Sequence, residues 1–337
     1  MRKGRIVKIY LTDRGEYLGF RGNEFFIRDK NRKEKGSWDV ENREISEIVL
    51  KAGNLISTNA LETALEWKIS VLFTRWNGEP LGMIKALDDD SHVKTRLCQY
   101  ESVKNCLGLE IAKKIVYAKL KGQNEVLKKY GFRQFDLMRI KEGIEKAEDR
   151  QTLLTLEGHA GLRYFKDIFS LFPEWLRVEH RRTQGTFDAL NNLFNFGYSI
   201  LFWKCYSAVL KAKLEAYLGF LHSVQVGKPS LVCDLQELYR YVVDDSIIQF
   251  GAKLRKTAFR RVYFGSKPKI PRLFLKAGKN REFERFLHAC FDMKVEIPRI
   301  RHGKRQTVET LINEEALLLA EYLRNEKPLW NPRIVEV

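Results

Sequence analysis

Three polar side chains that could bind a metal ion lie close together in segment 217–240, YLGFLHSVQVGKPSLVCDLQELYR. His222 precedes a Gly-Lys-Pro turn at 227–229, and Asp234 and Glu237 follow it in a predicted helix. Side chains at i and i+3 are neighbours on a helix, so these two carboxylates repel unless a cation separates them. The segment therefore predicts either a solvated acidic helix face or part of a metal site.

A further carboxylate, Glu157, lies in a strongly apolar stretch, with three leucines within residues 153–156. A carboxylate among apolar neighbours is costly to bury unless a cation or a hydrogen-bond donor satisfies it. The partner could be a metal ion or Arg163, which is near in sequence. His159 is a weaker candidate ligand, because two residues along a helix place it about 200° from Glu157.

Together these side chains supply mostly oxygen ligands and one imidazole nitrogen. That combination suits Mn²⁺ or Mg²⁺ better than a thiolate-preferring ion. A divalent ion of this kind polarises a phosphodiester and stabilises charge on the attacking or leaving oxygen. The chain contains no phosphate-binding GxxxxGK[ST] loop, GxGxxG fingerprint, GxSxG elbow or HExxH pair, so other common reaction classes lack support.

The charge of the chain indicates the kind of partner. Its 337 residues carry a formal net charge of +17. Such an excess favours a polyanion, and nucleic-acid phosphates are the obvious candidate. The alternative is a basic, solvated surface without a specific partner.

The cysteines and the most apolar segment argue against two other classes. The number of cysteines is odd and none form a CxxC pair, which disfavours a disulfide framework or a zinc ribbon: Cys98, Cys106, Cys205, Cys233 and Cys290. The apolar segment 196–210 is interrupted by Lys204, so we interpret it as a buried core helix rather than a membrane span. With no signal peptide evident, we expect a cytoplasmic protein without a membrane partner.

Two domains are expected, because the hydrophobic period changes along the chain. Residues 1–86 show period-two runs separated by turns at Gly15 and Gly22, and 87–93 form an acidic linker. Strands are predicted at 5–11, 16–22, 23–29, 44–52 and 69–75, with a helix beginning near 57–64. The fold class is α+β, a small N-terminal β-rich domain followed by a larger all-α helical domain.

Residues 94–337 show mainly the helical period and should form seven to nine helices. The clearest stretches are 102–131, 135–169, 186–215, 229–245 and 307–326.

Five blocks, in order along the chain, together resemble a known family. They are ISTNALETALEWKISVLFTRWNGEPLG (56–82), TRLCQYESVKNCLGLEIAKKIVYAKLKGQ (95–123), LEGHAGLRYF (156–165), DALNNLFNFGYSIL (188–201), and YLGFLHS with GKPSLVCDLQE (217–237). The chain is similar over about nine-tenths of its length to the CRISPR-associated endonuclease of the adaptation module, the integrase subunit that inserts new spacers.

This resemblance implies a site and a reaction. Glu157, His222 and Glu237 would be metal ligands, with Asp234 a further acidic position; the sequence leaves open which of Asp234 and Glu237 binds directly. Mn²⁺ or Mg²⁺ would be the ion, again without a choice between them. The implied reaction is the attack of a 3′-hydroxyl of a short DNA duplex on a phosphodiester at the boundary of a CRISPR repeat.

The resemblance also implies partners. These are DNA, a second small CRISPR adaptation protein, and a second copy of the chain in a homodimer joined through the β-rich domain. Residues beside the implied ligands are predicted phosphate contacts: Arg163, Tyr164, Lys228 and Arg240. The basic run 298–306 is another candidate. Two alternatives stay open, a structure-specific nuclease acting on branched DNA in repair and a noncatalytic nucleic-acid-binding scaffold.

Overall fold

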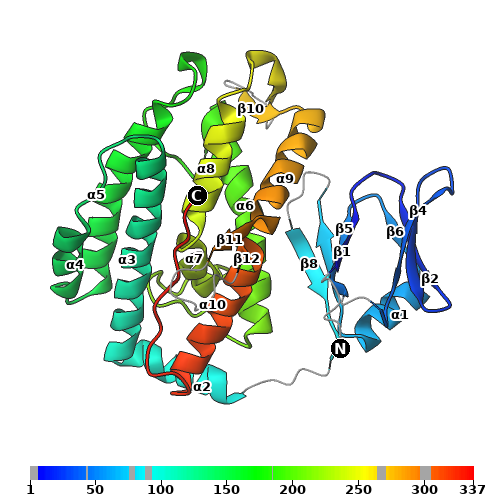
Figure 1. Cartoon of the computed structure of the whole chain (residues 1–337), viewed down its shortest axis with the longest axis horizontal. Coiled ribbons are helices and arrows are strands. Elements are labelled where there is room, and N and C mark those ends of the chain that lie inside the picture. Colours follow the sequence, from blue (N-terminus) through cyan, green and yellow to red (C-terminus); the bar gives the residue numbers. More distant parts are fainter. Residues whose placement is uncertain are drawn as a thin grey trace. The chain divides into compact units, whose positions relative to one another are not determined.

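The computed structural model describes residues 7–42, 45–75, 80–87, 93–183, 185–263, 271–296 and 305–337. The chain divides into two compact units, Met1–Asp90 and Ser91–Val337. The first unit consists mainly of strands and the second mainly of helices, which confirms the predicted α+β class (Figure 1).

The N-terminal unit contains two four-stranded sheets. In one sheet the order is β1 (Val7–Leu11), β5 (Ile45–Lys51), β7 (Ser70–Thr74) and β8 (Pro80–Ile84), and only β8 is antiparallel to its neighbour. The other has the order β4 (Glu34–Asp39), β3 (Glu24–Arg28), β2 (Tyr17–Arg21) and β6 (Leu55–Ile56). The five predicted strands are present, whereas β4, β6 and β8 were not predicted.

Local signals account for the connections in this unit. Gly22 adopts a φ of 57° in the turn between β2 and β3, a conformation that glycine enters without strain. Helix α1 (Thr58–Glu66) begins where predicted, because the Ser57 side chain accepts a hydrogen bond from the Ala60 amide. Apolar residues of both sheets and of α1 form one core, which includes Ile9, Phe25 and Ala64.

Nine α-helices lie in the described part of the second unit: α2 (Val93–Lys104), α3 (Cys106–Lys129), α4 (Leu137–Glu145), α5 (Arg150–Phe169), α6 (Ala189–Lys211), α7 (Ser230–Glu237), α8 (Arg240–Gly251), α9 (Ala277–Asp292) and α10 (Val308–Leu323). The predicted stretch 135–169 is two helices, and 229–245 breaks between α7 and α8 at Leu238 and Tyr239.

The second unit is not purely helical, contrary to the prediction. Strand β9 (Phe259–Val262) pairs with β10 (Arg272–Leu275), and β11 (Lys294–Glu296) pairs with β12 (Arg305–Thr307). These strands have three or four residues each, which is too short for a period-two pattern to stand out from the sequence.

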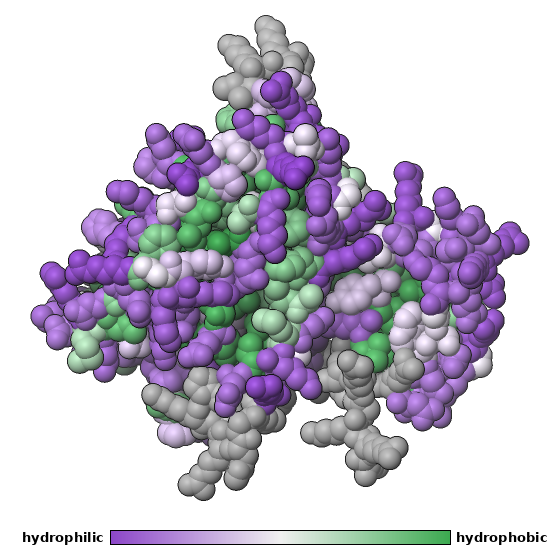
Figure 2. Space-filling view, turned by 45° about the horizontal axis from the view of Figure 1, so that its top comes forward, coloured by the Kyte–Doolittle hydropathy of each residue, from purple (hydrophilic) through white to green (hydrophobic). Residues whose placement is uncertain are grey.

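Helix α6 is central to the second unit. It packs against α7, α8 and α10, and α3 packs against both α5 and α8 (Figure 1). The predicted buried helix at 196–210 lies within α6, where Leu201 and Cys205 are fully buried. Among the described residues, no helix combines the length and the hydrophobicity that crossing a membrane requires. The face seen in Figure 2 is mostly hydrophilic, with smaller hydrophobic patches between the polar side chains.

Candidate metal centre

Asp234 organises the loop that carries His222. Its side chain is fully buried on α7, and its two oxygens accept hydrogen bonds from three consecutive backbone amides. The donors are Phe220 at 2.5 Å, Leu221 at 2.9 Å and His222 at 2.9 Å. Backbone N–H groups that converge on one carboxylate fix the local path of the chain, so Asp234 fixes the backbone position of His222.

The imidazole of His222 is oriented by the same carboxylate. Its Nδ1 lies 2.7 Å from Asp234 Oδ1, and the ring is 23% exposed. A ring that donates from Nδ1 to a carboxylate keeps the lone pair on Nε2, the arrangement found at histidines that bind metals. The contact with Asp234 therefore leaves Nε2 as the ring nitrogen with a lone pair that faces away from this carboxylate.

Close packing makes Gly219 necessary in this loop. A Cβ added there would lie 2.8 Å from Asp234 Oδ2 and 2.8 Å from the Ser230 backbone carbon, closer than real Cβ contacts. The Gly219 amide donates to Ser230 Oγ at 2.9 Å, and that hydroxyl donates to the Tyr217 carbonyl at 2.6 Å. The loop thus has no room for a side chain at this position.

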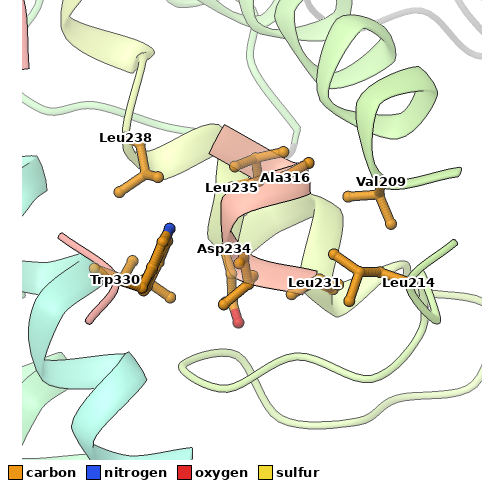
Figure 3. Close-up of a pocket in the computed structure, with 10 residues that line it drawn as sticks. Val209, Leu214, Leu231, Asp234, Leu235, Leu238, Ala316 and Trp330 are labelled. Carbon is orange, nitrogen blue, oxygen red and sulfur yellow. The ribbon is translucent and has the colours of Figure 1, made fainter. Parts of the chain in front are cut away.

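Asp234 has no oxygen left over for a cation. Each oxygen already accepts two hydrogen bonds, which uses the acceptor positions of a carboxylate. Figure 3 shows Asp234 among apolar side chains, including Leu231 and Trp330, around a cavity of about 10 Å³. Asp234 therefore supports the histidine, and Glu237 is the other carboxylate of α7.

Glu237 and Glu157 face each other across one ammonium group. The Lys119 Nζ on α3 pairs with Oε1 of Glu157 on α5 and, at 2.5 Å, with Oε2 of Glu237 on α7. Arg240 approaches the other Glu237 oxygen at 2.6 Å. Three helices thus bring two carboxylates that are 80 residues apart in sequence around a single positive charge.

The ionisation of Glu237 follows from these charges. Burial raises the pKa of this carboxyl group, but Arg240, Lys119 and His222 outweigh burial and lower it to about 2. Glu237 is therefore an anion at neutral pH although its side chain is only 3% exposed. Arg163 was one of the partners left open for Glu157, and in the structure Glu157 pairs with Lys119 instead.

These residues fit a hard divalent cation by donor type. Glu157 and Glu237 share a cation, and Glu237 Oε2 has no hydrogen-bond partner besides that ion pair within the described chain. Among the described residues, no three His, Cys, Asp or Glu side chains are grouped tightly enough to hold a metal ion as they stand. The ammonium of Lys119 lies between the two carboxylates and compensates both of them.

A buried network continues from Arg240 into the core. The guanidinium of Arg240 lies 4.9 Å from the ring centroid of Tyr198, whose hydroxyl donates to Asp244 at 2.5 Å. The hydroxyl of Tyr164 donates to the other Asp244 oxygen at 2.8 Å. Burial raises the pKa of Asp244 to about 6, although both tyrosines and the nearby arginines oppose the rise. This network supports the group that neutralises Glu237.

The predicted phosphate contacts lie in four different settings. Tyr164 is fully buried and bonded to Asp244, so its predicted contact with DNA has no basis in this geometry. Arg240 is paired with Glu237 but keeps 29% of its side chain exposed. Arg163 donates to the Arg133 carbonyl and lies 3.8 Å from Asp167, and Lys228 is half-buried in the loop before α7.

A larger basic surface, not predicted from the sequence, lies around β9, β10 and the start of α9. Between Asp245 and Glu282 the sequence has eleven Lys and Arg residues and no acidic one. The described exposed members of this surface, extending to the first turns of α9, are Lys253, Arg255, Lys256, Arg260, Arg261, Lys276, Lys279, Arg281 and Arg285. The absence of acidic residues over this span was the signal that could have identified it. Of the predicted basic run 298–306, residues 298–304 lie outside the described part.

Lys119 was also missed, although the sequence contains a signal for it. It continues the i, i+4 series of Ile111 and Ile115 on the buried face of α3, and Gln123 follows one turn later. A lysine in a buried stripe requires a negative partner. Asp244, in the same way, stands within the buried face of α8.

The family assignment rests on comparisons with known proteins. The sequence model of the family described as CRISPR associated protein Cas1 matches residues 9–279. A protein named CRISPR-associated endonuclease Cas1 2, from Pyrobaculum aerophilum, is 32% identical over 240 residues, which cover 66% of this chain and 80% of that protein.

Two solved structures share the fold. A casposase bound to integration product has a TM-score of 0.78 at 22% identity, over 96% of this chain and 92% of that chain. A Cas6-RT-Cas1–Cas2 complex has a TM-score of 0.75 at 19% identity, over 100% of this chain and 37% of that chain. Since the family match extends over most of the sequence, the protein belongs to the Cas1 family of CRISPR-associated proteins.

Proposed function

We propose that this protein is a metal-dependent DNA endonuclease and integrase that inserts short DNA spacers into a CRISPR repeat array. The reaction is a transesterification, in which a 3′-hydroxyl attacks a phosphodiester of the repeat. The observation that carries this proposal is the arrangement of Glu157 and Glu237 around one positive charge, beside an imidazole held by Asp234.

Glu157, Glu237 and His222 would hold Mn²⁺ or Mg²⁺. The ion would supply Lewis-acid stabilisation of charge on the phosphodiester oxygens. Asp234 keeps the proton of His222 on Nδ1, so that Nε2 remains a ligand. Arg240 balances one charge of Glu237 and, with part of its side chain exposed, can contact a phosphate oxygen.

DNA would be held by the basic surface around β9, β10 and the start of α9. Its arginines and lysines are exposed, and no acidic residue interrupts them between Asp245 and Glu282, which suits contacts along a phosphate backbone. Arg163 and Lys228 remain candidate phosphate contacts nearer the ligands in sequence. Tyr164 is not part of this proposal because its hydroxyl is used inside the core.

The proposed partners follow from the family. A solved complex with the same fold contains Cas1 and Cas2, which supports a second small adaptation protein as the partner. We also propose a homodimer joined through the N-terminal β-rich unit, and action in the cytoplasm where a repeat array is accessible. The predicted linker at 87–93 belongs to the same proposal, and residues 88–92 of it lie outside the described part of the chain.

A strand-transfer assay tests the function. Purified protein, with and without the second adaptation protein, is mixed with a short duplex bearing free 3′-hydroxyls and a supercoiled plasmid carrying a repeat. Joined products should form with Mn²⁺ and disappear with a chelator. His222→Ala should lose them, whereas His159→Ala, an exposed histidine on α5, should retain them.

The possible results separate the alternatives. Metal-dependent cleavage of branched DNA without any joining would favour a repair nuclease. Salt-sensitive DNA binding without metal-dependent chemistry, even with the second adaptation protein added, would favour a noncatalytic scaffold. Joining by both histidine variants would remove His222 from the essential chemistry.

A further inference from the structure

Lys119 has an unusual position for a lysine. It lies on the buried face of α3, its side chain is only 8% exposed, and Ile115 one turn earlier is buried. Burying an ammonium group is costly, so its position needs a compensating interaction. That compensation comes from Glu157 and Glu237, which both pair with the same Nζ atom.

The charges of this cluster balance only when Lys119 is present. Glu157 and Glu237 contribute two negative charges, and Lys119 and Arg240 contribute two positive ones. Removing the ammonium would leave two facing carboxylates with one uncompensated negative charge. In a site of low exposure such an imbalance is unfavourable. Lys119 therefore stabilises the site as long as no other cation is bound.

The oxygens that Lys119 contacts are those a metal ion would need. Arg240 binds Oε1 of Glu237, which leaves Oε2 as the oxygen directed toward Glu157. Oε2 has no hydrogen-bond partner among the described residues, and only the ammonium compensates it. A dication that arrived while the ammonium stayed in place would meet a neutral cluster instead of an anionic one, and attraction to it would be weak.

We propose that Lys119 is the resident cation of this site, and that a divalent metal ion binds by displacing its ammonium group from between Glu157 and Glu237. This inference rests on the proposed metal-dependent function. It extends that function by making metal binding a competition within the protein. The same lysine holds the site together without metal and weakens the affinity for metal.

Metal affinity in variants of the full-length protein tests the inference. The electron paramagnetic resonance signal of free Mn²⁺ gives the dissociation constant for the wild type and each variant. Lys119→Met keeps the length of the side chain without its charge and should bind Mn²⁺ at least about tenfold more tightly, a change of about 1.4 kcal/mol. Lys119→Arg keeps the charge and should bind no more tightly than the wild type.

Two controls and a second measurement complete the experiment. Lys121→Met, at an exposed position on the same helix, should bind Mn²⁺ as the wild type does, and Glu157→Gln should bind poorly. In chelator, Lys119→Met should have a lower Tm than the wild type. Saturating Mn²⁺ should raise the Tm of Lys119→Met by more than it raises the Tm of the wild type. A variant that folds only after Mn²⁺ is added would support the inference in the same way.

The inference and the proposed function fail differently. If neither the wild type nor Lys119→Met binds Mn²⁺, the metal-dependent function is wrong and the inference fails with it. If the wild type binds Mn²⁺ through Glu157 but Lys119→Met binds equally or less tightly, the function stands and displacement of Lys119 is wrong. Tighter binding by Lys119→Arg would also overturn the inference, because the charge would then not compete.

Discussion

The two halves of the candidate metal centre are built by different means. On the histidine side, a buried carboxylate holds His222 through three backbone amides and the ring itself. On the carboxylate side, Glu157 and Glu237 come from different helices and meet at the ammonium of Lys119. One half is fixed by hydrogen bonds that no ligand can replace, whereas the other is held by a charge that a metal ion can replace.

The two carboxylates of α7 make the same contrast on one helix. Asp234 and Glu237 are three residues apart and both are buried, yet Asp234 bonds to the backbone and Glu237 to charged side chains. The backbone amides that donate to Asp234 are part of the fold, so a ligand cannot displace them from this carboxylate. The partners of a buried carboxylate therefore decide whether it serves the fold or can bind a ligand. Burial alone does not distinguish these two roles.

The largest expected effect is on the fixed half. Asp234→Ala leaves two buried backbone amides and one partly buried amide without an acceptor, and each unsatisfied buried donor costs about 1–3 kcal/mol. We expect the free energy of unfolding to fall by about 4 kcal/mol, with or without Mn²⁺, in chemical denaturation. Asp136→Ala, which removes the exposed N-cap of α4, is the matched control and should cost about 1 kcal/mol. A loss no greater than in this control would mean that the histidine loop is fixed by something other than Asp234.

A second prediction concerns the network behind the exchangeable half. Burial raises the pKa of Asp244 from 3.8 to about 6, so between these values the native state keeps a proton that the unfolded state has lost. Stability then falls as the pH rises through this window, by about 3 kcal/mol for a shift of about two units. Asparagine does not titrate, so the free energy of unfolding of Asp244→Asn should not fall over this range. The difference in unfolding free energy between Asp244→Asn and the wild type should therefore shift by about 3 kcal/mol in favour of the variant from pH 4 to pH 7.

Denaturation curves at several pH values measure this difference. Glu148→Gln, an exposed residue outside the network, is the control. If the difference between Asp244→Asn and the wild type did not change with pH, Asp244 would not carry the raised pKa.

A third prediction tests whether Asp234 acts on metal through His222. Asp234→Asn keeps the size of the side chain but can no longer accept from both the backbone and the ring of His222. Loss of a carboxylate that orients a metal-binding histidine typically weakens binding by about 10- to 100-fold. We expect that loss in Mn²⁺ affinity, with the Glu157→Gln variant losing more. A loss of Mn²⁺ affinity in Asp234→Asn as large as that in Glu157→Gln, or larger, would identify Asp234 as a direct ligand. The histidine side and the carboxylate side of the centre would then not differ in the way described.

The parts of the fold that the sequence predicted are those with local causes. Helix α1 begins at the capping residue Ser57, the strands with alternating apolar residues are present, and α6 is buried as its composition indicated. The short strands β9–β12 were not predicted, because their pairing depends on contacts between segments rather than on a period within one. The break between α7 and α8 likewise interrupts an apolar pattern that runs through Leu238 and Tyr239 without change.

The candidate site shows the same limit. His222, Asp234 and Glu237 lie in one short segment and could be singled out by residue type and spacing. Lys119 could not be assigned to Glu157 from sequence, because the two are 38 positions apart and the chain between them does not show which helices pack together. Tyr164 shows the opposite error, since closeness in sequence to Glu157 suggested a contact with DNA while the turn of α5 directs its hydroxyl to Asp244.

The smallest expected effect is therefore at Tyr164. Tyr164→Phe removes one donor to Asp244 and should lower the free energy of unfolding by about 1 kcal/mol. Its DNA affinity, and the slope of that affinity with salt concentration, should equal those of the wild type in fluorescence anisotropy. Lys256→Ser with Arg261→Ser, on the basic surface, is the comparison and should reduce the slope by about two, since each lost phosphate contact lowers it by about 0.9. A reduced slope in Tyr164→Phe would show that Tyr164 does contact DNA. Because Tyr164 bonds to Asp244, the DNA contact would then be linked through Asp244 to the cluster of Glu157, Glu237 and Lys119.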